Sequence, residues 1–140
     1  MPTKLMTDEE LRDLFENNKA LMKRIADRLY AKEYELYSLD LGADLEVRAY
    51  TDNGFEHLYP VQPDPVLKKD FEDFLTLVDM GYDPSICVRL YNGYRVVDLT
   101  LHYSCPEGFC WHGLRYSPNY SFHEKSHIEG DWYIYQEWGV

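Results

Sequence analysis

The chain has 140 residues, of which 45% are hydrophobic, and a formal net charge of -11 at pH 7. This size suits one ordinary domain with its own core, so we expect a single domain over residues 1–140. The negative charge repels phosphate backbones, which disfavours direct binding to DNA or RNA and favours a partner protein with a basic surface.

Nothing in the composition points to a membrane or to a disulfide framework. The apolar runs fall short of the roughly 18 residues that a membrane span requires. The first residues, MPTKLMTDEELRD, turn acidic where a signal peptide has its apolar region. Three cysteines are a poor disulfide framework, although Cys105 and Cys110 could pair in an oxidising compartment. We therefore expect a cytoplasmic protein without membrane contact.

The first predicted element is a long helix. Thr7 and Glu10 have the spacing of a capping box, in which each side chain bonds the backbone N–H of the other residue. Apolar residues then recur on one face with the helical period: Leu11, Leu14, Phe15, Met22, Ile25 and Leu29. The pattern predicts one helix that runs to the low thirties and buries this face.

A β-hairpin follows in the predicted order. Apolar and polar residues alternate over residues 45–49, as in a strand with one buried face. Asn53-Gly54 is a strong signal for a tight hairpin turn. Residues 55–59 are expected to return as the partner strand until Pro60 ends the pairing.

A proline-rich connector, PVQPDP at residues 60–65, precedes a second predicted helix. Asp64 is placed to cap this helix and Pro65 to open it. Gly81 is expected to end it. Its buried face would contain Leu67, Phe71, Phe74, Leu75 and Val78.

The remainder of the chain predicts an antiparallel meander. We expect strands at residues 86–91, 94–104, 109–116 and 131–138, with a hairpin turn at Asn92-Gly93. The complete order is then αββαββββ. This order predicts an α+β fold in which two helices pack on one face of an antiparallel sheet of about six strands.

Polar residues in the long strand raise a first functional question. Asp98, Thr100 and His102 share one face of this strand, opposite an apolar face. They are either the solvated side of the sheet or a polar site in a cleft, where a small-molecule-binding or hydrolytic function would need a concave pocket.

The C-terminal stretch DWYIYQEWGV is rich in aromatic residues. Alternation places Trp132, Ile134, Gln136 and Trp138 on one side of the strand and Tyr133, Tyr135 and Glu137 on the other. At least one side is expected to be buried. A tyrosine-bearing face rimmed by acids is typical of a protein interface, and aromatic pairs are equally typical of a sheet core.

Residues 105–127, CPEGFCWHGLRYSPNYSFHEKSH, concentrate cysteine and histidine. The first interpretation is that Pro106, Glu107 and Gly108 form a tight turn between two strands, with the cysteines buried or half-buried beside it. The second is a zinc protease, because residues 123–127 have the pattern H-E-x-x-H. The second interpretation requires both histidines on one helix and a third ligand, for which only 13 residues remain.

The third interpretation is a structural zinc site. Cys105, Cys110, His123 and His127 have the ligand spacing of a Cys2His2 zinc finger, and this stretch of about 25 residues resembles that family. The positions used for base contacts would be Tyr116, Asn119 and Phe122, without a lysine or arginine. The resemblance therefore implies a zinc-stabilised structural or adaptor domain rather than a reader of DNA. The turn interpretation needs no metal. We adopt it, and we therefore expect no cofactor.

Acidic charge is concentrated in the middle of the chain. Residues 38–84 contain three basic and eleven acidic residues, and so account for -8 of the net charge of -11. We predict that part of this segment contacts the basic surface of a partner. The candidate contact residues are Asp40, Asp44, Glu46, Asp52, Glu56, Asp64, Glu72, Asp73 and Asp79.

The sequence therefore favours a small, acidic, non-enzymatic binding protein of the phage or bacterial cytoplasm. The most specific form of this hypothesis is an inhibitor that mimics nucleic acid and covers the nucleic-acid-binding groove of a nuclease or defence enzyme. A toxin-neutralising immunity protein would have the same composition. No glycine-rich phosphate loop or nucleophile elbow indicates an enzyme.

Overall fold

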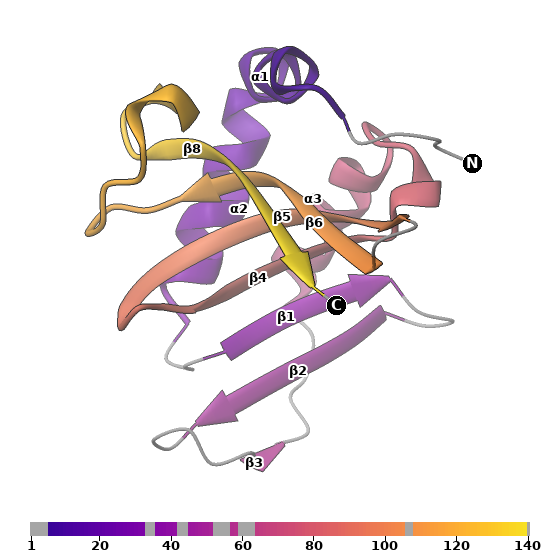
Figure 1. The fold of residues 1–140 in the computed structure, drawn as a ribbon. Coiled ribbons are helices and arrows are strands. Elements are labelled where there is room, and N and C mark those ends of the chain that lie inside the picture. Colours follow the sequence, from indigo (N-terminus) through magenta and orange to yellow (C-terminus); the bar gives the residue numbers. More distant parts are fainter. Residues whose placement is uncertain are drawn as a thin grey trace.

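In the part of the chain that the structure describes, eight strands form one antiparallel sheet, and three α-helices cover one of its faces (Figure 1). The computed structural model describes residues 6–32, 36–41, 45–51, 57–58, 64–105 and 108–139. Within these ranges, side chains are described except at residues 41, 45–51, 57–58, 80, 104–105, 108–109 and 138–139. The predicted α+β class is confirmed, although more helices and strands are present than the two and six expected.

The N-terminal helical segment consists of two helices rather than one. Thr7 forms the expected capping box with Glu10, and α1 spans Asp8–Asn17. α2 spans Lys19–Tyr30. Asn18 separates them: its backbone leaves the helical region, and its side-chain amide donates to the carbonyl oxygen of Leu14. Asparagine competes with helical backbone bonds in this way, and the apolar spacing, which continues across the break, does not reveal it.

β1 (Leu36–Leu41) pairs with β2 (Leu45–Thr51) and with β4, and it was not predicted. Its sequence, LYSLDL, does alternate between apolar and polar residues, so the signal was present. β2 also pairs with β3 (His57–Leu58), which confirms the expected hairpin pairing. The expected turn at Asn53-Gly54 lies outside the described residues.

α3 spans Pro65–Leu75 and begins as predicted. The Asp64 side chain accepts hydrogen bonds from the backbone N–H groups of Val66 and Leu67, and Pro65 occupies the first turn. The helix ends before the predicted stop at Gly81. A short 3-10 turn, η1 (Met80–Tyr82), occupies that position and leads into β4.

The C-terminal meander is confirmed and extended. β4 (Pro84–Tyr91), β5 (Tyr94–Cys105), β6 (Gly108–Tyr116) and β8 (Trp132–Gly139) are neighbours in the sheet. Asn92 and Gly93 both have positive φ, as a type I′ hairpin turn requires. β7 (His127–Glu129) adds an unpredicted edge strand, so the sheet order is β3-β2-β1-β4-β5-β6-β8-β7.

The hydrophobic core lies between the helices and one face of the sheet. Figure 1 shows α2 and α3 behind the strands, and none of the described helices lies on the opposite face, here called the open face. The buried core residues of the helices and strands include Leu11, Phe15, Met22, Leu29, Leu67, Phe71, Tyr37, Leu39, Ile86, Val88, Val97, Leu99, Leu114 and Trp132. No helix in the described ranges is both long and apolar enough to span a membrane.

Candidate binding site on the open face of the sheet

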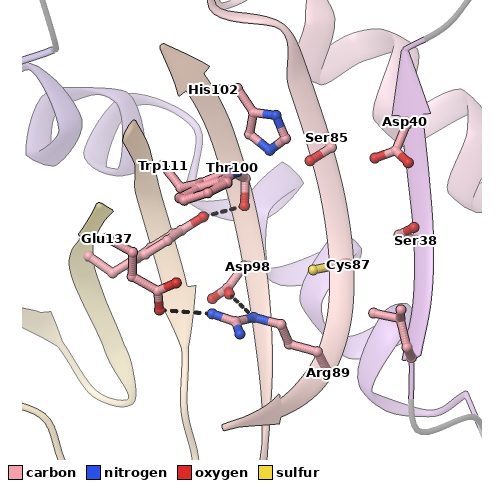
Figure 2. A pocket seen from close by; sticks show the side chains of 12 residues that line it. Ser38, Asp40, Ser85, Cys87, Arg89, Asp98, Thr100, His102, Trp111 and Glu137 are labelled. Carbon is pink, nitrogen blue, oxygen red and sulfur yellow. Dashed lines mark hydrogen bonds and ion pairs between the residues drawn. The ribbon is translucent and has the colours of Figure 1, made fainter. Parts of the chain in front are cut away.

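The open face contains a polar depression of about 310 Å³ (Figure 2). Five neighbouring strands form it, because side chains two residues apart on a strand point to the same face. Its lining residues are Leu36, Ser38, Asp40, Ser85, Cys87, Arg89, Asp98, Thr100, His102, Trp111, Tyr135 and Glu137. Only the first of these is aliphatic.

The depression exists because small residues meet at its centre. The strand register pairs Asp40 with Ser85, Ser85 with Thr100, Thr100 with Gly113, and Gly113 with Tyr135. These residues therefore form a row across five strands whose middle consists of a serine, a threonine and a glycine. Larger side chains project from the rows on either side, and the small row is the floor between them.

Gly113 allows the strands to approach closely in this floor. A methyl group at this position would overlap the backbone carbonyl oxygen of Leu99. The glycine also leaves space above β6 for the hydroxyl groups of Thr100 and Tyr135, on the two flanking strands, to form a hydrogen bond with each other (Figure 2). Both of these side chains are buried. This hydrogen bond links β5 and β8 across β6, which has no side chain at this position of the floor because the residue there is Gly113.

Two arginines and two carboxylates form a network at one side of the depression. Arg115 is 2% exposed and Asp98 is 1% exposed. Arg115 Nε lies 2.6 Å from Asp98 Oδ1, and its Nη2 lies 2.9 Å from Asp98 Oδ2. Arg89 donates one hydrogen bond to Asp98 Oδ2, at 2.8 Å, and another to Glu137 Oε1, at 2.9 Å. Arg115 Nη2 also donates to Glu137 Oε1, at 3.1 Å. These four residues are called the arginine–carboxylate network.

Aromatic rings surround the guanidinium group of Arg115. Its central carbon lies 4.3 Å from the ring centre of Tyr135, 4.9 Å from that of Tyr91 and 5.0 Å from that of Phe122. Cation–π contacts of this kind partly replace the lost hydration of a buried cation. Burial alone would lower the pKa of Arg115, but the hydrogen bonds to Asp98 raise it above its ordinary value. The group is therefore a fixed positive charge beneath the depression.

Two further groups in the depression, His102 and Cys87, have shifted pKa values. Burial lowers the pKa of His102 below its ordinary value. Burial raises the pKa of the Cys87 thiol to about 12. A thiol in this state is not an activated nucleophile. The depression therefore provides charge and hydrogen-bonding groups for binding, without an activated cysteine.

The predicted row Asp98, Thr100 and His102 lines this depression, as the cleft interpretation requires. The structure uses its members differently. Asp98 is bound to the two arginines, and Thr100 is bound to Tyr135. His102 is half-buried at the wall, where its ring contacts that of Trp111. The three side chains do not form a catalytic relay with one another.

The described candidate acids do not share one surface. Asp40 lines the depression on the open face. Asp64 is buried between α2 and α3, where Arg28 and Lys32 contact it at 2.6 and 2.7 Å. Burial alone would raise the pKa of Asp64, but these hydrogen bonds lower it far below its ordinary value. Its carboxylate therefore stabilises the helix layer.

The remaining acids of this set are on the helix side or are not described. Glu72 is exposed on α3, where Asp73 also pairs with Lys69 at 2.9 Å. Asp79 accepts a hydrogen bond from the backbone N–H of Gly81. The side chains of Asp44, Glu46, Asp52 and Glu56 lie outside the described residues.

The cysteine- and histidine-rich stretch forms a hairpin and an irregular segment. Cys105 pairs with Gly108 between β5 and β6, and Cys110 is buried. His123 precedes the 3-10 turn η2 (Glu124–Ser126), and His127 begins β7. Neither the H-E-x-x-H helix nor the finger helix is present in the described segment 117–126. Within the described part of the chain, no three His, Cys, Asp or Glu residues are grouped to hold a metal ion.

Aromatic packing explains why this segment is not helical. Tyr120 and Phe122 contact the ring of Tyr91, and Phe122 also contacts Tyr133. Ser117 donates to the carbonyl oxygen of Tyr120 and closes a turn there. Residues 117–126 thereby cover one end of the open face. Because Tyr133 and Tyr135 are buried within the chain, neither presents the exposed tyrosine face that an interface would use.

Sequence reasoning missed Arg89, Arg115, Cys87 and Trp111 as parts of this site. Their strands were predicted, but no face was assigned to these four residues, and the sequence did not indicate which strands were neighbours. Comparison with protein-family models, with curated proteins and with solved structures gives no match for this chain.

Proposed function

We propose that the protein is a small, non-enzymatic binding protein that engages a basic surface of a partner protein through the open face of its sheet. The observation that supports this most directly is the charge of the depression. Its lining contains three carboxylates, those of Asp40, Asp98 and Glu137, and one guanidinium group, that of Arg89, while the guanidinium group of Arg115 lies beneath it against Asp98 and Glu137. The chain as a whole has a net charge of -11, which would attract and steer such a partner.

The lining favours a protein ligand over a small-molecule substrate. Small-molecule sites have a few polar groups among apolar residues, whereas most of the residues that line this depression have polar or charged side chains. The absence of an activated thiol at Cys87 and the internal bonds of Asp98 and Thr100 argue against nucleophilic catalysis by these groups.

The finer form of the proposal is an inhibitor. A carboxylate-rich face would occupy a basic groove that normally binds nucleic acid, such as the groove of a nuclease or defence enzyme in the phage or bacterial cytoplasm. An immunity protein that neutralises a toxin would use the same charge complementarity, so the partner's activity distinguishes the two.

Affinity capture from a soluble extract of the source cells tests the proposal. The immobilised protein should retain a basic protein at low salt and release it at about 1 M salt, where the Debye length falls to about 3 Å. The purified partner should then bind the Asp40→Asn variant more weakly than Asp13→Asn, which removes the same charge from an exposed position on α1. Retention that is unchanged at high salt, or a partner without a basic surface, would refute charge-driven recognition.

A further inference from the structure

We propose that the depression binds one ring of an uncharged sugar, whose hydroxyl groups bond Ser38 and Ser85 at one side and the Arg89–Glu137 pair at another. This inference goes beyond the proposed function and does not depend on it, because it concerns a small ligand and not the partner protein. It follows from the unused hydrogen-bonding groups of the lining, from the balanced charge of the arginine–carboxylate network and from the size of the depression.

Two buried serine hydroxyl groups of the lining lack a hydrogen-bond partner. Ser38 on β1 and Ser85 on β4 line the depression, and each residue is 8% exposed. Within the part of the chain that the structure describes, neither hydroxyl group forms a hydrogen bond, and Figure 2 draws none from them. Cys87, the register partner of Ser38, adds a thiol, which is a weak donor. Polar groups this far removed from water are normally bonded, so this side of the depression suits a ligand with several polar groups.

The Arg89–Glu137 pair provides a fixed donor and a fixed acceptor. Arg89 bonds Asp98 through Nε and Glu137 through Nη2, so its Nη1 has no partner among the described residues. Glu137 accepts both of its hydrogen bonds at Oε1, and Oε2 accepts none from the same residues. These side chains are 30% and 37% exposed, so a ligand can reach them. A sugar hydroxyl accepts and donates at once, and hydrogen bonds to charged groups of this kind are stronger than neutral ones.

The charge of the network favours an uncharged ligand. Its two arginines balance its two carboxylates, so it has no unpaired charge for an ion to bind. Asp40 also lines the depression, but it is already engaged in the fold, so it is not counted as a free acceptor. An ion that enters would lose its hydration without gaining a free counter-ion, whereas a sugar exchanges hydrogen bonds with water for hydrogen bonds with the lining.

The size of the depression and the spread of these groups indicate a sugar ring. The volume of about 310 Å³ lies at the lower limit of the range of about 300–1,000 Å³ for ligand sites. Ser85 and Arg89 are four residues apart on β4, which corresponds to about 13 Å along the strand. A pyranose with hydroxyl groups on both sides of its ring, together with a hydrogen bond at each end, covers about this length, whereas a single carboxamide is too short. Most small-molecule sites are largely apolar, but a sugar is covered with hydroxyl groups and suits a polar lining.

Titration of the full chain with neutral sugars, followed by ¹H–¹⁵N NMR, tests this inference. The probes are glucose, galactose, mannose and N-acetylglucosamine. At least one should shift the Ser38, Ser85 and Cys87 amides saturably, with a Kd of about 1 mM, as expected for a ligand of about a dozen non-hydrogen atoms. The glucosamine cation, which keeps the ring and adds a charge, should bind more weakly than glucose. Glycerol, which has hydroxyl groups but no ring, should not bind saturably.

Matched serine variants locate the site. Ser38→Ala and Ser85→Ala should each weaken binding of the preferred sugar about fivefold, the value of one hydrogen bond. Ser121→Ala, which removes the same hydroxyl group from an exposed position outside the lining, should leave binding unchanged. Unchanged cross-peaks away from the depression and an unchanged urea midpoint establish that each variant is folded.

Four results would overturn the inference. They are the absence of saturable shifts with all four sugars, an equal response to the four sugars and to glycerol, wild-type affinity in the Ser38→Ala, Ser85→Ala double variant, and tighter binding of the glucosamine cation than of glucose. Affinity capture of a basic protein is a separate measurement. The proposed function can therefore stand when the sugar site fails, and the sugar site can stand when no basic partner is captured.

Discussion

Replacing Asp98 with alanine should destabilise the fold by about 3 kcal/mol. Asp98 is 1% exposed, and it accepts two hydrogen bonds from Arg115 and one from Arg89. The substitution removes the carboxylate but leaves the Arg115 guanidinium group, which is 2% exposed, in the same place. A buried charge without its counter-ion is the main source of the expected loss.

The remaining contacts set the size of the effect. Breaking a buried ion pair by removing one partner costs about 3–5 kcal/mol. Glu137 stays within 3.1 Å of Arg115 and within 2.9 Å of Arg89, so both arginines keep one carboxylate. We therefore expect the lower end of that range. A domain is typically stable by about 5–15 kcal/mol, so the variant should fold but unfold at a clearly lower denaturant concentration.

Urea unfolding followed by far-UV circular dichroism measures this loss. With a slope of about 1–3 kcal/mol per molar urea, the midpoint should fall by about 1–3 M. The control is the double variant Asp98→Leu with Arg115→Met, which removes both charges and keeps apolar volume. It should recover most of the stability, because apolar replacement of a buried pair is often neutral. A loss below about 1 kcal/mol in Asp98→Ala, the value of an exposed pair, would refute the reasoning.

Three further predictions concern His112, Gly113 and Cys87. Burial lowers the pKa of His112 from 6.5 to about 4, so the unfolded chain binds a proton at this imidazole more readily than the folded chain. The free energy of unfolding should therefore fall by about 3 kcal/mol from pH 6.5 to pH 4. Urea unfolding at a series of pH values measures this fall, which should be smaller in His112→Gln. Gly113→Ala should lower the free energy of unfolding by more than about 3 kcal/mol, because the added methyl group would overlap the Leu99 carbonyl oxygen. The control Gly93→Ala should lower it by roughly 1 kcal/mol, because the added methyl group touches no other atom there and the only cost is the positive φ of that residue. A similar loss in both variants would contradict this. Cys87 should react with iodoacetamide at neutral pH far more slowly than a cysteine in a free peptide, since its pKa is raised to about 12; site-resolved mass spectrometry measures this, and rapid labelling would contradict it.

The first of these three has a defined pH window. His112 is 1% exposed, and its Nε2 accepts a hydrogen bond from the backbone N–H of Met6. Protonation in the folded state would remove that acceptor. His102 also has a lowered pKa, so it contributes in the same direction, and the difference between the wild type and His112→Gln isolates the buried ring. The contribution is complete only above about pH 7.5, where the imidazole is neutral in the unfolded as well as in the folded state.

Local signals in the sequence predicted the elements that depend on local chemistry. The Thr7–Glu10 capping box, the Asp64 cap and the Asn92-Gly93 turn each satisfy backbone groups within a few residues, and all three are present. The break at Asn18 was not predicted, because the apolar period continues across it. Its cause is a single side-chain hydrogen bond to Leu14, which no hydrophobic pattern contains.

The site could be predicted only in part, because it depends on register. Alternation placed Asp98, Thr100 and His102 on one face, and the depression is over that face. It did not show that Arg115 and Asp98 are direct cross-strand neighbours, or that Gly113 stands between Thr100 and Tyr135. The helical interpretations of residues 117–127 failed for a related reason. Contacts with Tyr91 and Tyr133, distant in sequence, hold that segment in place.

The arginine–carboxylate network raises the question of why charges are buried at the edge of a binding site. A buried ion pair contributes little net stability compared with apolar packing, so stability alone does not explain it. The network fixes the side chains of Arg89 and Glu137, which would otherwise rotate freely at the rim. A rim that is already ordered lowers the entropy cost of binding.

This role predicts a separation of stability from binding. The Asp98→Leu, Arg115→Met double variant keeps the fold and retains Asp40 and Trp111, but it releases Arg89 from Asp98. It should therefore unfold near the wild-type urea concentration and yet bind the basic partner protein several-fold more weakly, with loss of NMR order at Arg89 and Glu137. Equal stability with equal binding would mean that the network supports only the fold. The network would then have no part in shaping the depression for binding.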